Sequence, residues 1–443
     1  MSSTSPVPFT VQQVMIGAES TVGTAAAAND MKTTNVHPFD YSGLEAVALE
    51  NRRAHMRGVM LKPFVGKRTG RITLSQDFHG WKSSIPTAAP TVSDAPATPS
   101  AHPLLDYLGA LLGNRKADGY QATADLTGST TSLLKISDAS GGLANMSVGH
   151  PVLIDTSDTS KPYEVLWLQD IDTSGDPDVG TLVQTAAFAD TSASATVWGA
   201  ITAYHVAAGS PFWANGTIKA YTIQLFGADS DAKHTLKGCM PIGGSLVLTA
   251  GEMPQLDLEW GVSHWDADSS GGNPADVDYN DGDVGSAGNE FPDAEPFVDA
   301  WVTLSDASAP SAASQIRVQD LRIDFNVEAV EIRDPAGESG VCGYAISKRN
   351  PTISFTVYRE YAEEVADWLN GTEKCFSFQH GSQPGKIIAG IMPECFHVQH
   401  PTYTNVDDLI GSQIVIGAGP YADDTGSRVD SAPINQAFRL AVL

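Results

Sequence analysis

Acidic side chains crowd one glycine-rich loop, and carboxylate oxygens at such a density are the ligands that calcium prefers in proteins. The loop contains Asp276, Asp278, Asn280, Asp281 and Asp283. An EF-hand would need glycine at the sixth position, where Asp281 stands, and glutamate at the twelfth, where the chain has alanine. We therefore expect a solvated acidic loop, and we retain Asp276, Asp278 and Asp283 as candidate metal ligands.

A second group of carboxylates, Asp257 and Glu259, has the residue types that a glycosidase uses for acid and base catalysis. These two residues alternate with Leu256, Leu258 and Trp260, which is the pattern of a strand with one apolar and one solvated face. We therefore interpret the carboxylates as the solvated face of a strand.

Other catalytic and cofactor motifs are missing or incomplete. GAGPYA, at residues 417–422, imitates a dinucleotide-binding loop, but no helical pattern follows it, and a helix N-terminus is needed to bind the pyrophosphate. The sequence has neither an HExxH zinc motif nor a GxSxG nucleophile elbow. We expect no enzymatic activity and no cofactor. The four cysteines have no CxxC spacing and are expected to be buried free thiols: Cys239, Cys342, Cys375 and Cys395.

The elements that must position these residues are mostly strands. Apolar and polar residues alternate between Gly, Asn, Asp and Pro turns, which is typical of antiparallel sheets with one solvated face. Two clear examples are RITLSQDF, at residues 71–78, and TISFTVYR, at residues 352–359. The sequence therefore predicts a mainly β fold.

Only two segments have a helical pattern of apolar residues, and each ends at a glycine. The first lies at 102–114, with an apolar stripe made by five leucines. The second lies at 361–371, and its predicted stripe consists of Val365, Trp368 and Leu369. Each predicted helix follows one of the two matching strands.

This order extends to an internal repeat. LEAVAL, at 44–49, returns as VEAVEI, at 327–332, with an offset of 327 − 44 = 283, so that Ala48 matches Glu331. The pair Lys67-Arg68 returns as Lys348-Arg349 with an offset of 348 − 67 = 281. After the helices, LKGCMP, which ends at residue 241, matches IAGIMP, which ends at residue 393. The common order of these matches favours a duplication over chance recurrence of short β patterns.

The first copy is longer than the second, and the extra residues fit one block of short strands. We predict five segments: residues 1–115 and 207–265 form the first copy, 116–206 form an inserted small all-β domain, 266–315 form the acidic loop, and 316–443 form the second copy.

The composition excludes several classes of function. The chain has 443 residues, with 26 Lys and Arg against 52 Asp and Glu, and its formal net charge of −26 repels nucleic acid and acidic membranes. The first residues lack the basic and apolar regions of a signal peptide, and no window is apolar enough for a membrane helix. We expect synthesis in the cytoplasm and no membrane partner.

Four stretches of the chain are similar to the major tail tube proteins of long-tailed (siphovirus-like) viruses of bacteria and archaea. The first is VMIGAESTVGTAAAAND, at 14–30, and the second is KRTGRITLSQDFHG, at 67–80, with the leucine-rich helix after it. The third lies at 234–265 and the fourth at 317–378. Together they cover about 60% of the chain, whereas the insert and the acidic loop depart from the family pattern.

The resemblance implies a structural virion protein. It implies two tandem β-sandwich domains, each with one flanking helix, whose sheets join around a ring to form a closed inner barrel. Three chains would supply the six tube domains of one ring, and stacked rings would form the tail tube through which double-stranded DNA is ejected. The implied partners are further copies of the chain, the tape measure protein, the tail terminator and the baseplate or tail tip proteins. Assembly is expected in the host cytoplasm.

The resemblance also assigns roles to residues, and the lumen is expected to be acidic on balance so that DNA passes without binding. The polar faces of the two matching strands would point into the lumen: Thr73, Ser75, Asp77, Thr352, Ser354 and Thr356. The basic loops after the repeated strands would contact the adjacent ring: Arg52, Arg53, Arg57, Lys62, Lys67, Arg68, Lys348 and Arg349.

A different class of function remains open at this stage. The insert contains aromatic residues of the kind that line sugar-binding platforms, namely Tyr163, Trp167, Trp198 and Tyr204. These residues would suit a β-rich virion adhesion or carbohydrate-binding protein, although they also fit core positions. A polysaccharide-cleaving enzyme is a third alternative, supported only by carboxylates without partners.

Overall fold

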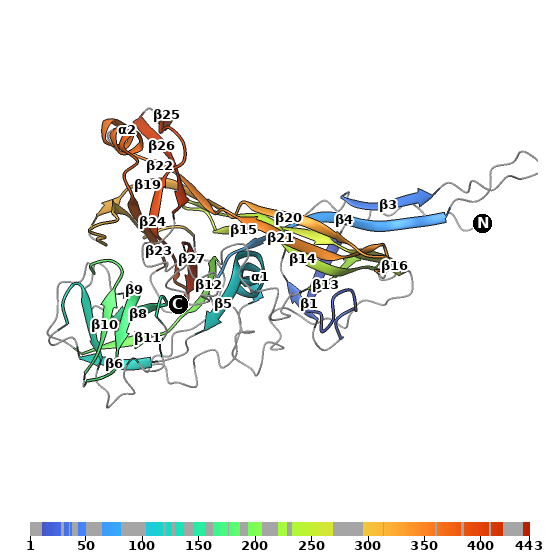
Figure 1. Cartoon of the computed structure of the whole chain (residues 1–443), viewed down its shortest axis with the longest axis horizontal. Helices are drawn as coiled ribbons and strands as arrows, with labels where there is room; N and C mark the ends of the chain where they lie inside the picture. The colour runs from blue at the N-terminus through green and yellow to red at the C-terminus, as the bar shows by residue number, and fades with distance from the viewer. Residues whose placement is uncertain are drawn as a thin grey trace, which may run out of the picture.

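The computed structural model of this protein is built almost entirely from antiparallel strands, as the sequence predicts (Figure 1). Neither of the two helices among the described residues is long and apolar enough to cross a membrane. The structure describes residues 11–27, 31–34, 36–37, 43–49, 64–80, 103–117, 121–125, 129–136, 143, 146, 148–155, 163–175, 177–186, 194–205, 220–227, 233–268, 296–312, 314–335, 337–358, 361–381, 385–406, 409–419 and 437–443.

The elements fall into two repeats and an insert. The first repeat contains β1 (Val11–Ala18), β2 (Lys32–Thr34), β3 (Leu44–Leu49), β4 (Phe64–Asp77), α1 (Pro103–Leu112), β13 (Tyr221–Gly227), β14 (Lys233–Thr249), β15 (Gln255–Val262) and β16 (His264–Asp268). The second contains β17 (Trp301–Asp306), β18 (Gln315–Ile316), β19 (Val318–Asp324), β20 (Val327–Arg333), β21 (Val341–Arg349), β22 (Thr352–Val357), α2 (Tyr361–Asn370), β23 (Lys374–His380), β24 (Ile388–His397), β25 (Thr402–Val406) and β26 (Leu409–Ala418).

The insert and its base contain β5 (Gly113–Ala117), β6 (Gln121–Asp125), β7 (Leu133–Ile136), β8 (Pro151–Asp155), β9 (Tyr163–Asp172), β10 (Asp178–Leu182), β11 (Ser194–Trp198) and β12 (Ile201–His205), and the described chain ends with β27 (Arg439–Val442).

One antiparallel sheet runs through both repeats in the order β3-β4-β15-β14-β19-β22-β26-β25. The repeats meet where β14 pairs with β19, with Leu246 opposite Ile323 and Leu248 opposite Leu321. All four side chains are fully buried. We call this eight-stranded sheet the shared sheet.

The two repeats have the same strand pairing in the shared sheet. Ile72 lies opposite Trp260 in the first repeat, and Ile353 lies opposite Ile416 in the second. The offsets are 353 − 72 = 281 on one strand and 416 − 260 = 156 on the other, and they hold over the whole common pairing of β4 with β15 and of β22 with β26. A one-residue slip would turn every side chain to the other face, so an identical register gives both repeats the same polar and apolar faces.

This register corrects two of the sequence matches. Val327 lies opposite Arg349 as Ala46 lies opposite Arg68, so β3 and β20 also have an offset of 281, and Ala48 corresponds to Ala329 rather than to Glu331. The spelling LEAVAL and VEAVEI therefore matched two residues out of register, because both strands alternate Glu, Ala and Val with period two.

The second match, between the two Met-Pro pairs, is wrong by four residues. Cys239 lies opposite Tyr221, and Cys395 lies opposite Lys374, each beside a β-bulge at the same place in its strand pair. The two cysteines therefore correspond, with an offset of 395 − 239 = 156. Met240 accordingly corresponds to Phe396, one residue further along.

A single hydrophobic core extends under both repeats. It contains the apolar face of the shared sheet, the strands β1 and β13, and helix α1. The five leucines of α1 are almost completely buried, so the predicted stripe is confirmed. The second repeat caps this helix, because Arg349 donates a hydrogen bond from Nε to the carbonyl oxygen of Leu111 at 2.8 Å. Burial lowers the pKa of Arg349 to about 10, so the side chain is still charged at neutral pH.

Helix α2 contradicts the predicted apolar stripe. It ends at Gly371 in a Schellman motif, in which Thr372 donates to the carbonyl oxygen of Asp367. Its Leu369 is 69% exposed, whereas Glu364 is fully buried and lies 3.3 Å from Nε2 of His397. An ion pair thus replaces an apolar contact on the face of α2 that meets β24.

The insert forms one six-stranded sheet in the order β6-β11-β8-β9-β10-β7, and its edge strands β6 and β7 also contact each other. Strands β5 and β12 at its base pair with each other, and β12 also pairs with β27, which pairs with β24. The insert therefore lies beside the second repeat, as Figure 1 shows. The sheet of the insert spans residues 121–198, within the predicted 116–206.

Candidate functional site

The polar face of the shared sheet is a surface to which the two repeats contribute equivalent residues. Apolar side chains of each strand enter the core, and the alternate ones point to this face. The charged residues that three of its strands contribute are Arg71 and Asp77 of β4, Asp257 and Glu259 of β15, and Asp320, Arg322 and Asp324 of β19.

The charge of this face is negative on balance. On these three strands two arginines stand against five carboxylates, which gives a net charge of 2 − 5 = −3. Arg71 binds Glu259 at 3.0 Å, and Arg322 binds Asp324 at 2.8 Å, so each arginine is neutralised by a neighbour. Such a face repels phosphate groups, because it offers them no cation that is not already paired.

The residues predicted to face a lumen lie on this face. Thr73 and Asp77 are exposed and Ser75 is half-buried, between apolar residues that enter the core. In the second repeat, Thr352 and Ser354 are half-buried, and Thr356 is buried beside β26.

Sequence reasoning missed the contribution of β19. The alternation in VQDLRID, residues 318–324, places Asp320, Arg322 and Asp324 on the polar side. That pattern is visible in the sequence, but the pairing of β19 with β14 joins residues from different repeats, and no local pattern indicates such a partner.

The shared sheet ends at a strand whose outer edge has no partner among the described residues. β25 pairs with β26 on one side only. Its Tyr403 is 64% exposed, whereas Leu246 of β14, which occupies the corresponding position, is fully buried against β19. The exposure of these two side chains differs because β19 lies next to Leu246, whereas no described strand lies next to Tyr403 on the outer side of β25.

The hairpin of β20 and β21 crosses from the second repeat onto the first, where it lies along β14 and β15 (Figure 1). Tyr344 packs on Met240 and on Gly261, where a Cβ atom would lie 2.6 Å from its ring. Glycine is therefore needed for this close approach. Lys67 binds Glu331 of the hairpin at 2.7 Å, and this hydrogen bond lowers the pKa of Glu331.

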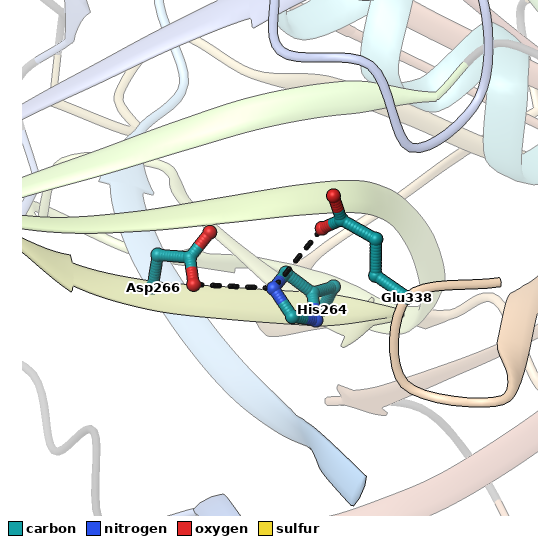
Figure 2. Close-up of side chains that lie close together, drawn as sticks. All are labelled: His264, Asp266 and Glu338. Atoms are coloured by element: carbon teal, nitrogen blue, oxygen red, sulfur yellow. Dashed lines mark hydrogen bonds and ion pairs between the residues drawn. The ribbon is translucent and has the colours of Figure 1, made fainter.

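Three potential metal ligands meet at the turn of this hairpin (Figure 2). Nε2 of His264 lies 3.2 Å from Asp266 and 3.1 Å from Glu338, and the three ligand atoms lie within 4.8 Å of one another. Two cations already bind the same groups, because Arg68 lies 2.7 Å and Lys237 3.1 Å from Asp266.

These contacts favour an ion-pair cluster over a metal site. Burial raises the pKa of Asp266, whereas the hydrogen bond from Lys237 and the charges of His264 and Arg68 lower it. The lowering effects together are larger, so the net shift is downward. Nδ1 of His264 lies 2.6 Å from Oγ of Ser339, whose hydroxyl donates to the carbonyl oxygen of Arg68. The cluster thus holds the turn of the second repeat against the first. The sequence offered only the pair His264 and Asp266, two residues apart on one strand face.

The described members of the predicted inter-ring set bind within the chain. Lys67 and Arg68 make the contacts with Glu331 and Asp266, Lys348 lies 3.5 Å from Glu328, and Arg349 caps α1. The other predicted members lie outside the described residues: Arg52, Arg53, Arg57 and Lys62.

Other sequence candidates have structural roles or lie outside the described residues. Trp167 is almost fully buried, and Tyr163 packs with it in a cluster that joins the insert to the second repeat. This burial argues against a sugar platform at these two residues. Cys239, Cys375 and Cys395 are buried free thiols, as predicted, and Cys342 is half-buried. The metal candidates and the side chains of two aromatic residues lie outside the description: Asp276, Asp278, Asp283, Trp198 and Tyr204.

No protein-family model matches this chain, and no curated protein matches it.

Proposed function

We propose that this protein is a structural virion protein that polymerises into stacked rings and forms the hollow tail tube of a long-tailed virus. The observation that carries the proposal is the shared sheet, in which two repeats with the same register are joined edge to edge. A chain that continues its own sheet from one repeat to the next has the geometry needed to continue it into a further copy. Closure into a barrel then removes the exposed edges.

The two ends of the shared sheet support this continuation. At one end, β25 corresponds to the part of β14 that pairs with β19. At the other end, the main chain of His37 donates to the carbonyl oxygen of Ser75, on the side of β4 away from β15. By the offset of 281, His37 and Gly43 correspond to Val318 and Asp324, the two ends of β19, and Arg71 donates to the carbonyl oxygen of Gly43 on the same side of β4. The edge at β25 therefore fits the edge that His37 and Gly43 mark beside β4 of a second copy.

This pairing is head to tail, so its repetition gives a ring when the rotation closes. Two repeats per chain and a ring of six repeats require three chains. The polar face would line the lumen, where a net charge of −3 per chain favours free passage of double-stranded DNA. The role needs no enzymatic group and no cofactor. Its other partners would be the proteins that set tube length and close the two ends of the tail.

Electron microscopy of the purified protein tests the proposal. We expect hollow filaments of stacked rings, and native mass spectrometry of disassembled filaments should give a mass of three chains, each 46.7 kDa. Discrete particles at high concentration, with no filaments under any salt condition, would refute the tube. Rings of six chains would refute the assignment of two tube repeats to each chain.

A further inference from the structure

An uncovered apolar patch lies on the second repeat at the place where the first repeat is covered by a hairpin. Phe396 is 40% exposed and Val398 is 43% exposed. Phe396 lies opposite Gly417 as Met240 lies opposite Gly261, and the offset is 156 on both strands. Val398 corresponds to Ile242 by the same offset. Its main-chain N–H donates to the carbonyl oxygen of Val415, and Val415 is the counterpart of Glu259 on the strand next to Ile242.

The corresponding place on the first repeat is closed by the hairpin of β20 and β21. Met240 is 6% exposed and Ile242 is 3% exposed, because Tyr344 and Ala329 of that hairpin pack on them. Without the hairpin this surface would be an exposed apolar patch of the same kind. The chain therefore contains two versions of this surface: the hairpin covers the first, whereas in the second Val398 packs on Gly417 and both Phe396 and Val398 stay partly exposed.

The hairpin that corresponds to the covering one is formed by β3 and the first half of β4. It has the same bulge and the same register, with Ala48 opposite Val65 as Ala329 is opposite Ile346. Among the described strands, β3 pairs only with β4, and Figure 1 shows this hairpin extending away from both repeats. In Figure 1 the hairpin points away from β24, the strand that contains Phe396, so we expect it to reach only the patch of another copy.

We infer that the hairpin of β3 and β4 binds the patch of Phe396 and Val398 on a second copy of this chain. The inference rests on the proposed ring and adds to it a second contact, separate from the pairing of sheet edges. A membrane or an unrelated protein is a less suitable occupant, because neither supplies a hairpin with this register. Burial of these two partly exposed apolar side chains removes their remaining apolar surface from water and so stabilises the joint.

Cysteine cross-linking tests the contact directly. The double variant Ala48→Cys with Phe396→Cys, in a Cys342→Ser background, places one thiol on each side. Under oxidation we expect covalent dimers and trimers on a non-reducing gel, and the series should end at three chains because a ring of three closes on itself. The matched positive control is Ala329→Cys with Met240→Cys, which should form the same bond within one chain and stay monomeric. Each single-cysteine variant should give no ladder.

Substitution of the patch provides a second measurement. Phe396→Asp with Val398→Asp should abolish filaments but leave a folded monomer, whereas Leu369→Asp, at an even more exposed apolar site on α2, should not affect assembly. Normal filaments from the patch variant, or no cross-links while the intrachain control forms, would overturn this inference and leave the tube intact. Absence of filaments from the unmodified protein would instead overturn the proposed function.

Discussion

The negative charge of the shared sheet's polar face leads to a quantitative prediction for DNA binding. Asp257 and Asp320 lie on this face, and no ion pair to either is found among the described residues. The substitutions Asp257→Lys and Asp320→Lys change the face from −3 to −3 + 4 = +1 per chain. In a ring of three chains, the change is from −9 to +3. The lumen then attracts phosphate where it now repels it.

The magnitude follows from counterion release. If about three phosphates are neutralised per ring, the logarithm of the binding constant falls with the logarithm of salt concentration with a slope of about −2.7, which is about −0.9 for each phosphate. A fourfold rise in salt, from about 50 to about 200 mM, then weakens binding by about 40-fold. Unmodified filaments should retain no duplex at either concentration.

The assay is cosedimentation of short DNA duplexes with assembled filaments over a series of salt concentrations. A matched control has the same total charge with the reversals elsewhere, and Asp170→Lys with Asp172→Lys serves because both residues are exposed on β9 of the insert and not on the shared sheet. If the control filaments retain as much duplex as the face variant, the charge of the whole protein matters and not that of the lumen. Equal DNA retention by unmodified filaments would refute the reasoning altogether.

Three further predictions concern the contacts that hold the repeats together. Arg349→Met should lower the free energy of unfolding by about 1.5–3 kcal/mol, because the α1 cap is lost, while the neighbouring Lys348→Met, at an exposed site, should leave the urea midpoint unchanged. Glu364→Leu or His397→Leu should each lower the free energy of unfolding by about 3 kcal/mol or more, whereas the double variant should recover most of this loss. Additive losses of the two single variants in urea unfolding would contradict a coupled pair. The hydrogen bond from Lys67 lowers the pKa of Glu331 below 4.5 in the folded protein. The ionised carboxylate therefore stabilises the fold above about pH 4.5, and this stabilisation is lost as the pH falls through the pKa of the folded state. The fall in urea midpoint between about pH 6 and about pH 3.5 should be smaller in Glu331→Gln than in the unmodified protein.

Local patterns predicted the local structure well. Alternation located the main strands and the leucine stripe of α1, because each of these patterns reports which side chains face the core. The stripe on α2 failed since Glu364 is buried with His397, and a pair between residues far apart in sequence leaves no periodic signal. The repeat was visible, but its register was not, because period-two patterns match equally well when they are shifted by two residues.

The candidate site was predicted only in part for the same reason. Thr73 and Ser354 could be placed on a polar face from alternation alone. The contacts of Arg68 with Asp266 and of Tyr344 with Gly261 could not, because both join residues far apart in sequence and the second also joins the two repeats. Such contacts depend on how the hairpin of the second repeat crosses the first.

The two hairpin contacts also differ in chemistry, which bears on how a ring would assemble. Within the chain, the joint combines the apolar contact at Met240 with the ion pairs around Asp266. By the offset of 156, the counterparts of Lys237 and Asp266 in the second repeat are Pro393 and Ala422, so the charges are missing there and Phe396 is larger than Met240. Apolar contacts keep their strength as salt rises, whereas ion pairs are screened. The patch on the second repeat thus offers apolar burial without the ion pairs at Asp266 that strengthen the joint inside the chain.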